Sequence, residues 1–137
     1  MGKIITFGTL KGGVGKTMLC FNIGGILAQL ARQDLLTTYD IYRVDNPPPE
    51  PQQLVLQAPI SQLPQMDMIA GSIFLHKVEL NIASVAGREQ ILSNYLSDHQ
   101  AFFSQYDYLL IDTNPSMSII NQNAFLASDA ILLVSDV

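Results

Sequence analysis

One short stretch near the start of the chain has the residue types that phosphate chemistry needs. It reads LKGGVGKTM and covers residues 10–18. Its glycines allow backbone N–H groups to turn inward around an anion, in conformations that a Cβ atom would block. Lys16 would neutralise the β- and γ-phosphates of a nucleotide, and the hydroxyl of Thr17 would bind Mg²⁺. The stretch therefore predicts a phosphate-binding loop rather than an ordinary glycine-rich turn.

The loop departs from the usual pattern G-x-x-x-x-G-K-[ST], which would place a glycine at position 10. The chain has Leu10 there, and a second lysine, Lys11, precedes the glycine pair. The residues expected to bind the nucleotide are Lys11, Gly12, Gly13, Val14, Gly15, Lys16, Thr17 and Met18.

Asp112 is the second candidate for this site. It ends the apolar stretch YDYLLID, residues 106–112, which is typical of a buried strand. A strand-end carboxylate beside a phosphate loop would hold Mg²⁺ through water, together with Thr17. The alternative is that Asp112 only caps the turn that follows it. We take Lys11, Lys16 and Asp112 as the candidate catalytic residues.

The elements around these residues alternate between strands and helices. Apolar patterning predicts strands at 3–9, 66–72, 106–112 and 130–136, and helices at 16–33, 74–83, 88–103 and 118–128. Residues 35–43 could form a short helix, and the proline-rich residues 46–51 should be an extended surface connector. Such alternation predicts an α/β fold with a parallel sheet flanked by helices, in a single domain over residues 1–137.

Composition excludes several kinds of site. Seven basic residues are spread along a chain of net charge −5, so charge alone does not favour nucleic-acid binding. The single cysteine, Cys20, cannot form a disulfide within the chain and suits a core position. His76 and His99 lack partners at metal-ligand spacing and are expected on helix faces. No apolar run is long enough for a membrane span. The single cysteine, which leaves no disulfide within the chain, favours a cytoplasmic protein.

Three segments carry a family resemblance. KGGVGKT (11–17) resembles the deviant Walker A loop of the ParA/MinD family of ATPases, which includes Soj-type partition proteins. YDYLLIDTNPS (106–116) resembles that family's Walker B and switch II segment, and 121–137 resembles the helix and strand that follow it. The resemblance implies a P-loop NTPase fold with ATP or ADP and Mg²⁺ as cofactors.

The resemblance also implies a role for the extra lysine. In the family, two subunits enclose two ATP molecules, and the residue matching Lys11 reaches the phosphates in the partner's site. A second cation there spreads the charge on the transferred phosphoryl group. The chain is thus similar to ATPases of chromosome or plasmid partition, with three implied partners: a second copy of itself, a centromere-binding ParB-like protein, and non-specific DNA contacted through segments beyond this sequence. Association with the nucleoid would follow from the DNA contact.

The chain departs from the family in ways that leave alternatives open. After Gln33 the family has a strand ending in an aspartate, whereas this chain continues DLLTTYDIYR from Asp34, where Asp40 is the nearest substitute. We therefore expect residues to be missing between Gln33 and Asp34. Asn114 stands where proline is common, and relatives continue past Val137, so the sequence is expected to be incomplete or truncated. The alternatives are a nucleotide-binding module without turnover and a MinD-like cell-division regulator, whereas one cysteine disfavours a reductase iron protein.

Overall fold

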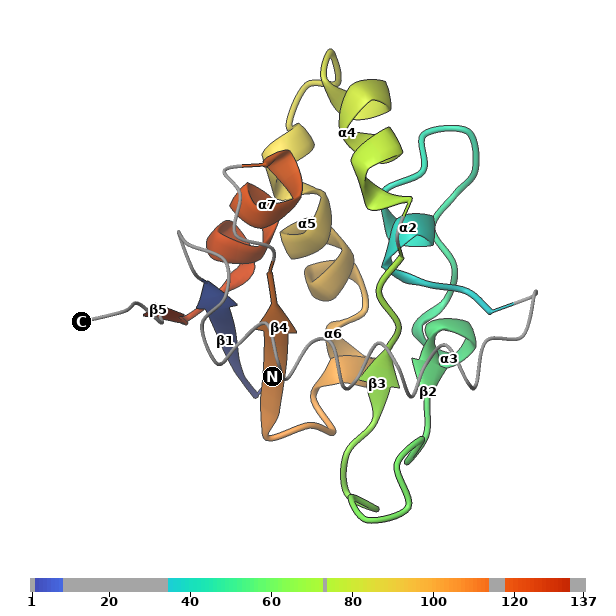
Figure 1. Ribbon diagram of the computed structural model, residues 1–137, viewed down its shortest axis with the longest axis vertical. Helices are drawn as coiled ribbons and strands as arrows, with labels where there is room; N and C mark the ends of the chain where they lie inside the picture. Colours follow the sequence, from blue (N-terminus) through green and yellow to red (C-terminus); the bar gives the residue numbers. More distant parts are fainter. Residues whose placement is uncertain (1, 9–34, 73, 114–117, 134–137) are drawn as a thin grey trace.

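A computed structural model describes residues 2–8, 35–72, 74–113 and 118–133 of the chain. Its centre is a parallel sheet in the order β4-β1-β5 (Figure 1). The three strands are β1 Lys3–Gly8, β4 Tyr108–Asp112 and β5 Ala130–Leu133. The strands expected at 3–9, 106–112 and 130–136 are thus confirmed within the described residues. The expected helix at 16–33 lies outside them.

Strand β1 is central because its KIITFG run can be buried on both faces. It pairs in parallel with β4, with Ile4 opposite Leu109, and with β5, with Thr6 opposite Ile131. The chain passes from β4 through α7, Ile119–Ala127, to β5. These two strands are consecutive in this sheet's sequence order, yet β1 lies between them in space.

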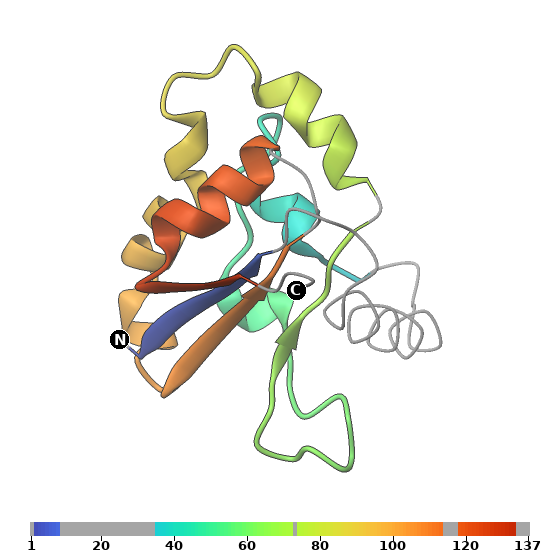
Figure 2. The ribbon, with the colours of Figure 1, turned by 60° about the vertical axis from the view of Figure 1, so that its left-hand side comes forward.

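Helices cover one face of this sheet. Figures 1 and 2 both place α7 and α5, Ile91–Asp98, on the same side, with α4, Leu75–Ile82, beyond them. The helices expected at 74–83 and 118–128 are confirmed. The buried core joins β1 to these helices and to the connecting segments, and its buried members are Ile4, Ile41, Tyr42, Leu54, Val78, Ile82, Tyr95, Leu96 and Phe103.

The helix expected over 88–103 is in fact three pieces. They are η1 Arg88–Gln90, α5, and α6 Gln100–Phe103. The break falls at His99, whose backbone leaves the helical region at φ −110° and ψ 27°. The ring Nδ1 of His99 lies 2.9 Å from the carbonyl oxygen of Tyr95, which also accepts the backbone N–H of His99. Side chain and backbone therefore compete for one acceptor at the break.

The strand expected at 66–72 does not belong to the parallel sheet. It is reduced to β3, Met68–Ile69, which pairs antiparallel with β2, Val55–Leu56. Both figures place this hairpin on the β4 side of the parallel sheet. The prediction of a parallel strand was wrong here because the apolar run pairs with a neighbour that the sequence did not reveal.

The connecting region 35–56 contains more helix than expected. The short helix suspected there is present as α2, Thr38–Ile41. Residues 46–50 are non-helical, as expected of a connector, but Pro51 begins α3, Pro51–Leu54, and is buried. Proline suits the first helical position because the missing N–H would have no partner there. The expected extended segment 46–51 therefore ends one residue early.

Candidate functional site

The candidate site lies where β1 and β4 end. Asp112 is the last residue of β4, and its Cα is paired in register with that of Phe7. Strand β1 ends one residue later, at Gly8, and the glycine-rich stretch 10–18 follows directly in sequence. Parallel strands present their carboxyl ends at one edge, where α/β proteins bind ligands. The register therefore places the end of β1, which the expected phosphate loop follows in sequence, beside the exposed Asp112.

The eight expected loop residues from Lys11 to Met18 lie outside the described residues, as does Asn114. Their roles remain predictions. The donor set that the sequence offers suits magnesium, since Mg²⁺ prefers carboxylate and hydroxyl oxygens with several waters. Within the described ranges, no cluster of three or more His, Cys, Asp or Glu residues could hold a metal ion. A magnesium site would thus use Asp112 together with Thr17 of the loop.

The helix after Asp112 is anchored at its first turn. Ser118 caps α7 by accepting the backbone N–H of Asn121 at 3.2 Å. Glu79 of α4 accepts the backbone N–H of Ile120 at 3.3 Å. A carboxylate at this end of the helix also interacts favourably with the positive end of the helix dipole. The chain that leaves Asp112 therefore enters a helix whose start is fixed by two side chains.

Asn123 anchors the middle of α7. Its side chain is fully buried, with 0% exposed. Its amide nitrogen donates to the carbonyl oxygens of Arg88 at 2.7 Å and Ile119 at 2.9 Å, and its oxygen accepts the N–H of Leu92 at 3.0 Å. Leu92 is in the first turn of α5, where backbone N–H groups have no partner within the helix. One side chain thus ties α7 to η1 and α5.

Strand β1 is fixed to the end of α7 and to the start of β5. The buried Thr6 hydroxyl donates to the Ala124 carbonyl at 3.1 Å and contacts the Ser128 hydroxyl. The Asp129 carboxylate accepts the N–H of Ile4 at 2.9 Å, and the Asp129 N–H donates to the Ile4 carbonyl at 2.8 Å. These contacts fix the strand that leads into the glycine stretch. Sequence reasoning missed them, although Thr6 and Asn123 stand out as polar residues in apolar elements.

Asp40 has a structural role. Its carboxylate accepts the backbone N–H of Thr37 at 2.8 Å and completes a capping box at the start of α2. It also lies 3.8 Å from the guanidinium of Arg43. A capping carboxylate of this kind satisfies backbone groups at the start of a helix. Asp40 is thereby engaged in holding α2, which does not favour it as a substitute for the family's aspartate.

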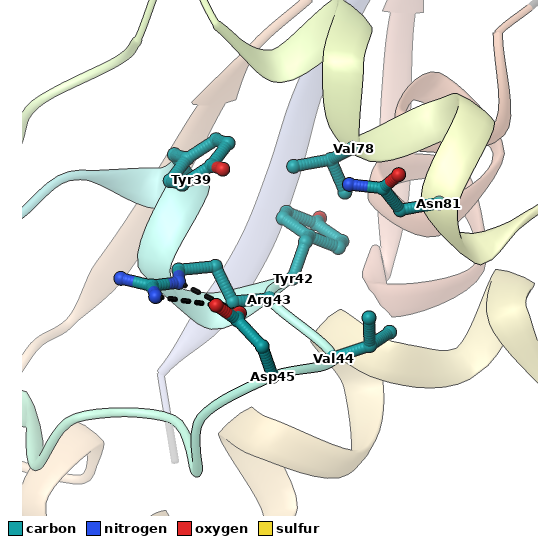
Figure 3. Close-up of a pocket in the computed structure, with 7 residues that line it drawn as sticks. All are labelled: Tyr39, Tyr42, Arg43, Val44, Asp45, Val78 and Asn81. Atoms are coloured by element: carbon teal, nitrogen blue, oxygen red, sulfur yellow. Dashed lines mark hydrogen bonds and ion pairs between the residues drawn. The ribbon is translucent and has the colours of Figure 1, made fainter.

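Figure 3 shows a surface hollow of about 290 Å³ beside α2. Arg43 binds Asp45 through two hydrogen bonds, of 2.9 and 2.7 Å, and these hold the pKa of the Asp45 carboxyl below its usual range. Burial raises the pKa of Tyr42 well above its usual value. Neither group would change protonation near neutral pH, so they offer no general acid or base there.

His76 lies on a helix, as the sequence suggested, whereas His99 falls at the break between two helices and not on a helix face. His76 is exposed on α4, and His99 lies between α5 and α6 with its Nε2 3.6 Å from a Glu50 oxygen. Tyr106, just before β4, packs against the core, whereas Tyr108 of β4 is 65% exposed. None of the described helices has the length and apolarity to cross a membrane.

These features define a class of protein. A central parallel strand leads into a glycine-rich loop, and the adjacent strand ends in an aspartate at the same edge. This is the arrangement of P-loop nucleotide-binding proteins.

Comparisons with known proteins agree with this class. The family described as AAA domain matches residues 2–137, and the chain belongs to it, as a member of the ParA/MinD type. The chain is 31% identical over 149 residues to sporulation initiation inhibitor protein Soj of Bacillus subtilis, covering 97% of this chain and 58% of Soj. It is 29% identical over 147 residues to chromosome partitioning protein ParA of Caulobacter vibrioides, covering 96% and 55%. The chain spans about half the length of the curated relatives it matches.

Solved structures share the fold. Cobyrinic acid a,c-diamide synthase from Mycobacterium smegmatis, with bound ATP analog and magnesium, aligns with a TM-score of 0.72 at 20% identity, over 97% of this chain and 59% of that one. A plasmid partition protein from Borrelia burgdorferi aligns with a TM-score of 0.71 at 21% identity, over 97% and 65%. At these identities the likeness shows the fold alone.

The sequence alignments also reveal a difference in length. The match to Soj runs over 149 positions, whereas 97% of this 137-residue chain is about 133 residues, which leaves about 16 positions without a residue here. The match to cell division protein PomZ of Myxococcus xanthus runs over 139 positions against 90% of the chain, about 123 residues, and leaves a similar number. This supports an internal shortening. The Gln33–Asp34 junction itself lies outside the described residues, so its place remains a prediction.

Proposed function

We propose that residues 1–137 form one P-loop domain that binds ATP with Mg²⁺ and hydrolyses it in a dimer-dependent site, in chromosome or plasmid partition. The observation that carries this proposal is the register of Asp112 with the end of β1, the strand that leads into the glycine stretch. The names of the relatives Soj and ParA support the partition role.

In this proposal the glycines and Lys16 hold the phosphates, and Thr17 and Asp112 hold Mg²⁺. The metal supplies charge neutralisation at the transferred phosphoryl group when it is bound. Lys11 acts on the phosphates of a second copy of the chain. Neighbours of the same fold were crystallised with an ATP analog, with ADP and magnesium, and with ATP, which supports ATP or ADP with Mg²⁺ as cofactors.

The proposed partners are a second copy of this chain, a ParB-like centromere-binding protein and DNA contacted through segments outside this sequence. The partition relatives support these partners. We propose cytoplasmic residence with nucleoid association on the same grounds.

The phosphate role of Lys16 is testable by titrating a fluorescent ATP analogue. Charge-assisted contacts of this kind are worth about 1.5–3 kcal/mol, so Lys16→Ala should weaken binding by about 10- to 150-fold. Lys77→Ala is the matched control, because Lys77 is exposed on α4 and lies over the Phe74 ring, away from the phosphate stretch in sequence. Equal affinity of Lys16→Ala and the parent would remove the phosphate-loop assignment.

The role of Lys11 differs in a measurable way. Lys11→Ala should leave nucleotide affinity in the monomer nearly unchanged, because in this proposal Lys11 serves the partner's site. It should abolish ATP-dependent dimerisation and any hydrolysis. Light scattering with and without ATP checks this, and a dimer that forms with ATP in the variant would exclude the proposed role.

A second candidate is a nucleotide-binding module without turnover. The internal shortening of about 16 residues relative to Soj favours it, because the strand expected after Gln33 would end in the aspartate that the family has there. Intact nucleotide binding with no phosphate release would establish this candidate over the first. The relative named cell division protein PomZ, 31% identical over 139 residues, keeps a MinD-like role in cell division as a further alternative.

A further inference from the structure

We propose that the hollow beside α2 is a binding site for a small neutral molecule that carries a carbonyl or amide group on a flat apolar body. The hollow has a volume of about 290 Å³ and is lined by residues of α2, of the segment after it and of α4 (Figure 3). Asp112 is not among the described residues that line it. The inference therefore does not rest on nucleotide binding.

The hydroxyl of Tyr42 is the main observation. The Tyr42 side chain is only 4% exposed and packs in the core with Val78. Figure 3 shows its ring pointing from the end of α2 toward Val78 and Asn81. Among the described residues none hydrogen-bonds to this hydroxyl, and burial alone raises its pKa, so it stays protonated and is a donor. A buried donor without an acceptor costs free energy, which a ligand oxygen in the hollow would recover.

Asn81 supplies a second polar group. It is exposed on α4 and lines the same hollow as Tyr42. Its carboxamide has no hydrogen-bond partner within the described ranges. A carboxamide offers both a donor and an acceptor, and a phenol offers a strong donor. Tyr42 and Asn81 together match a carbonyl oxygen with a neighbouring N–H group, which is the pattern of an amide.

The charges at the hollow favour a neutral ligand. Arg43 binds Asp45 through two hydrogen bonds, of 2.9 and 2.7 Å, and its guanidinium lies 3.8 Å from the Asp40 carboxylate. Among the described residues that line the hollow, Arg43 and Asp45 are the charged ones, and they neutralise each other. A charged ligand would have to break this pair to find a counter-charge.

The remaining walls favour a flat apolar body. The ring of Tyr39 and the side chain of Val44, which is 59% exposed, line the hollow. An aromatic ring packs well against another in stacked or edge-on contact. The volume of about 290 Å³ is near the lower limit of small-molecule pockets and equals about ten water-sized groups. It therefore suits one ring with one polar substituent, whereas a single water would leave most of the space unused.

The walls of the hollow are fixed before any ligand enters. A capping box between Thr37 and Asp40 holds the start of α2. The Thr38 N–H donates to the Ala70 carbonyl at 2.8 Å. Because the polar groups already stand on anchored elements, binding needs little ordering of the chain.

Benzamide is a suitable probe because it is a neutral ring with one amide group. It is titrated into the full chain while backbone and side-chain amide signals are followed by NMR. The signals of Tyr42 and Val44 and of the Asn81 carboxamide should shift and saturate. A dissociation constant of about 1–10 mM is expected for a ligand of about nine non-hydrogen atoms.

Two matched pairs of variants test the contacts. Tyr42→Phe removes only the hydroxyl and should weaken benzamide binding about fivefold or more. Thr38→Val is its control, because the Thr38 hydroxyl is also buried without a partner but does not line the hollow. Asn81→Ala should weaken binding as well, whereas Leu80→Ala, at an 80% exposed neighbour on α4, should not.

Three results would overturn the inference. Absence of saturating shifts up to about 50 mM benzamide, well above the expected constant, would mean that the hollow holds only water. Equal binding by Tyr42→Phe and Thr38→Val would mean that the probe does not contact the Tyr42 hydroxyl. Tyr42→Phe should unfold at the same temperature as the parent or higher, so a fall of about 4 °C or more, or failure to fold, would mean that the hydroxyl already has a partner in the protein.

Discussion

At the scale of single residues, Asn123 shows how one buried side chain can fix three elements. Its amide satisfies two carbonyl groups and one N–H group, on η1, α7 and α5. Buried polar groups are stabilising only when their hydrogen bonds are complete, and removing one partner leaves the others unsatisfied. The helix that follows Asp112 is therefore held in place by a residue that does not itself face the site.

We expect Asn123→Ala to lower the free energy of unfolding by about 2–4 kcal/mol, because it leaves a cavity and backbone groups without partners. Urea unfolding measures this. Gln122→Ala is the control on the same helix, since Gln122 is exposed, and it should change stability by less than about 0.5 kcal/mol. Similar effects of the two substitutions would show that the Asn123 contacts do not hold the helices.

At the scale of elements, the approach of β1 to β4 depends on a glycine. A Cβ atom added at Gly2 would meet the backbone carbonyl oxygens of Tyr106 and Asp107. These are backbone atoms, so the strand itself would have to shift. The next residue, Lys3, donates its N–H to Asp107, which is the first bond of the β1–β4 ladder. A side chain at position 2 would therefore disturb the pairing that aligns Asp112 with the end of β1.

Gly2→Ala should destabilise the protein by about 1–3 kcal/mol, as overpacking does elsewhere. Gly71→Ala is a matched control, because a Cβ atom there would have no neighbour within 4 Å. The midpoints of thermal unfolding of the two variants would be compared. If Gly2→Ala has the same unfolding midpoint as the parent and as Gly71→Ala, the close approach at Gly2 is refuted.

At the scale of the whole molecule, a tyrosine–aspartate contact joins the hairpin to the parallel sheet. The Tyr106 hydroxyl, just before β4, donates to Asp67, just before β3, at 2.7 Å. Asp67 also accepts the Ala58 N–H at 2.9 Å. The hydrogen bond from Tyr106, and then that from Ala58, lower the pKa of the Asp67 carboxyl. Burial, and then the bond to Asp67, raise the pKa of Tyr106 to about 12.

This contact predicts a loss of stability at each end of the pH range, from Asp67 at acid pH and from Tyr106 at alkaline pH. Asp67 has a lowered pKa when folded, so its contribution is present above the unfolded value of about 3.9 and is lost as the pH falls below it. Tyr106 has a raised pKa, so its contribution is complete below about pH 10 and is lost as the pH rises toward 12.

Asp67→Asn should therefore reduce the dependence of stability on pH at the acid end, and Tyr106→Phe should reduce it at the alkaline end. Each substitution should lower the free energy of unfolding at pH 7 by about 0.5–1 kcal/mol. Urea midpoints measured from pH 3 to 11 would show both effects. Unchanged slopes in both variants would mean that the contact does not form in solution.

The sequence by itself determined the elements whose signal is local. Strands β1, β4 and β5 and helices α4 and α7 were predicted because long apolar runs and helical periodicity do not depend on distant partners. Asp112 was predicted at a strand end for the same reason. The phosphate loop is a contiguous motif, so it too could be proposed from sequence, although it lies outside the described residues.

Only the tertiary structure decided features that require two distant segments. The pairing of β2 with β3, the break at His99, and the different exposure of Tyr106 and Tyr108 all depend on neighbours that no local pattern names. Asn123 and Gly2 have their roles because residues 31 and 104 positions away in the chain come within contact distance. Packing and hydrogen bonding act through space, so the sequence specified which side chains were available and the fold determined which of them meet.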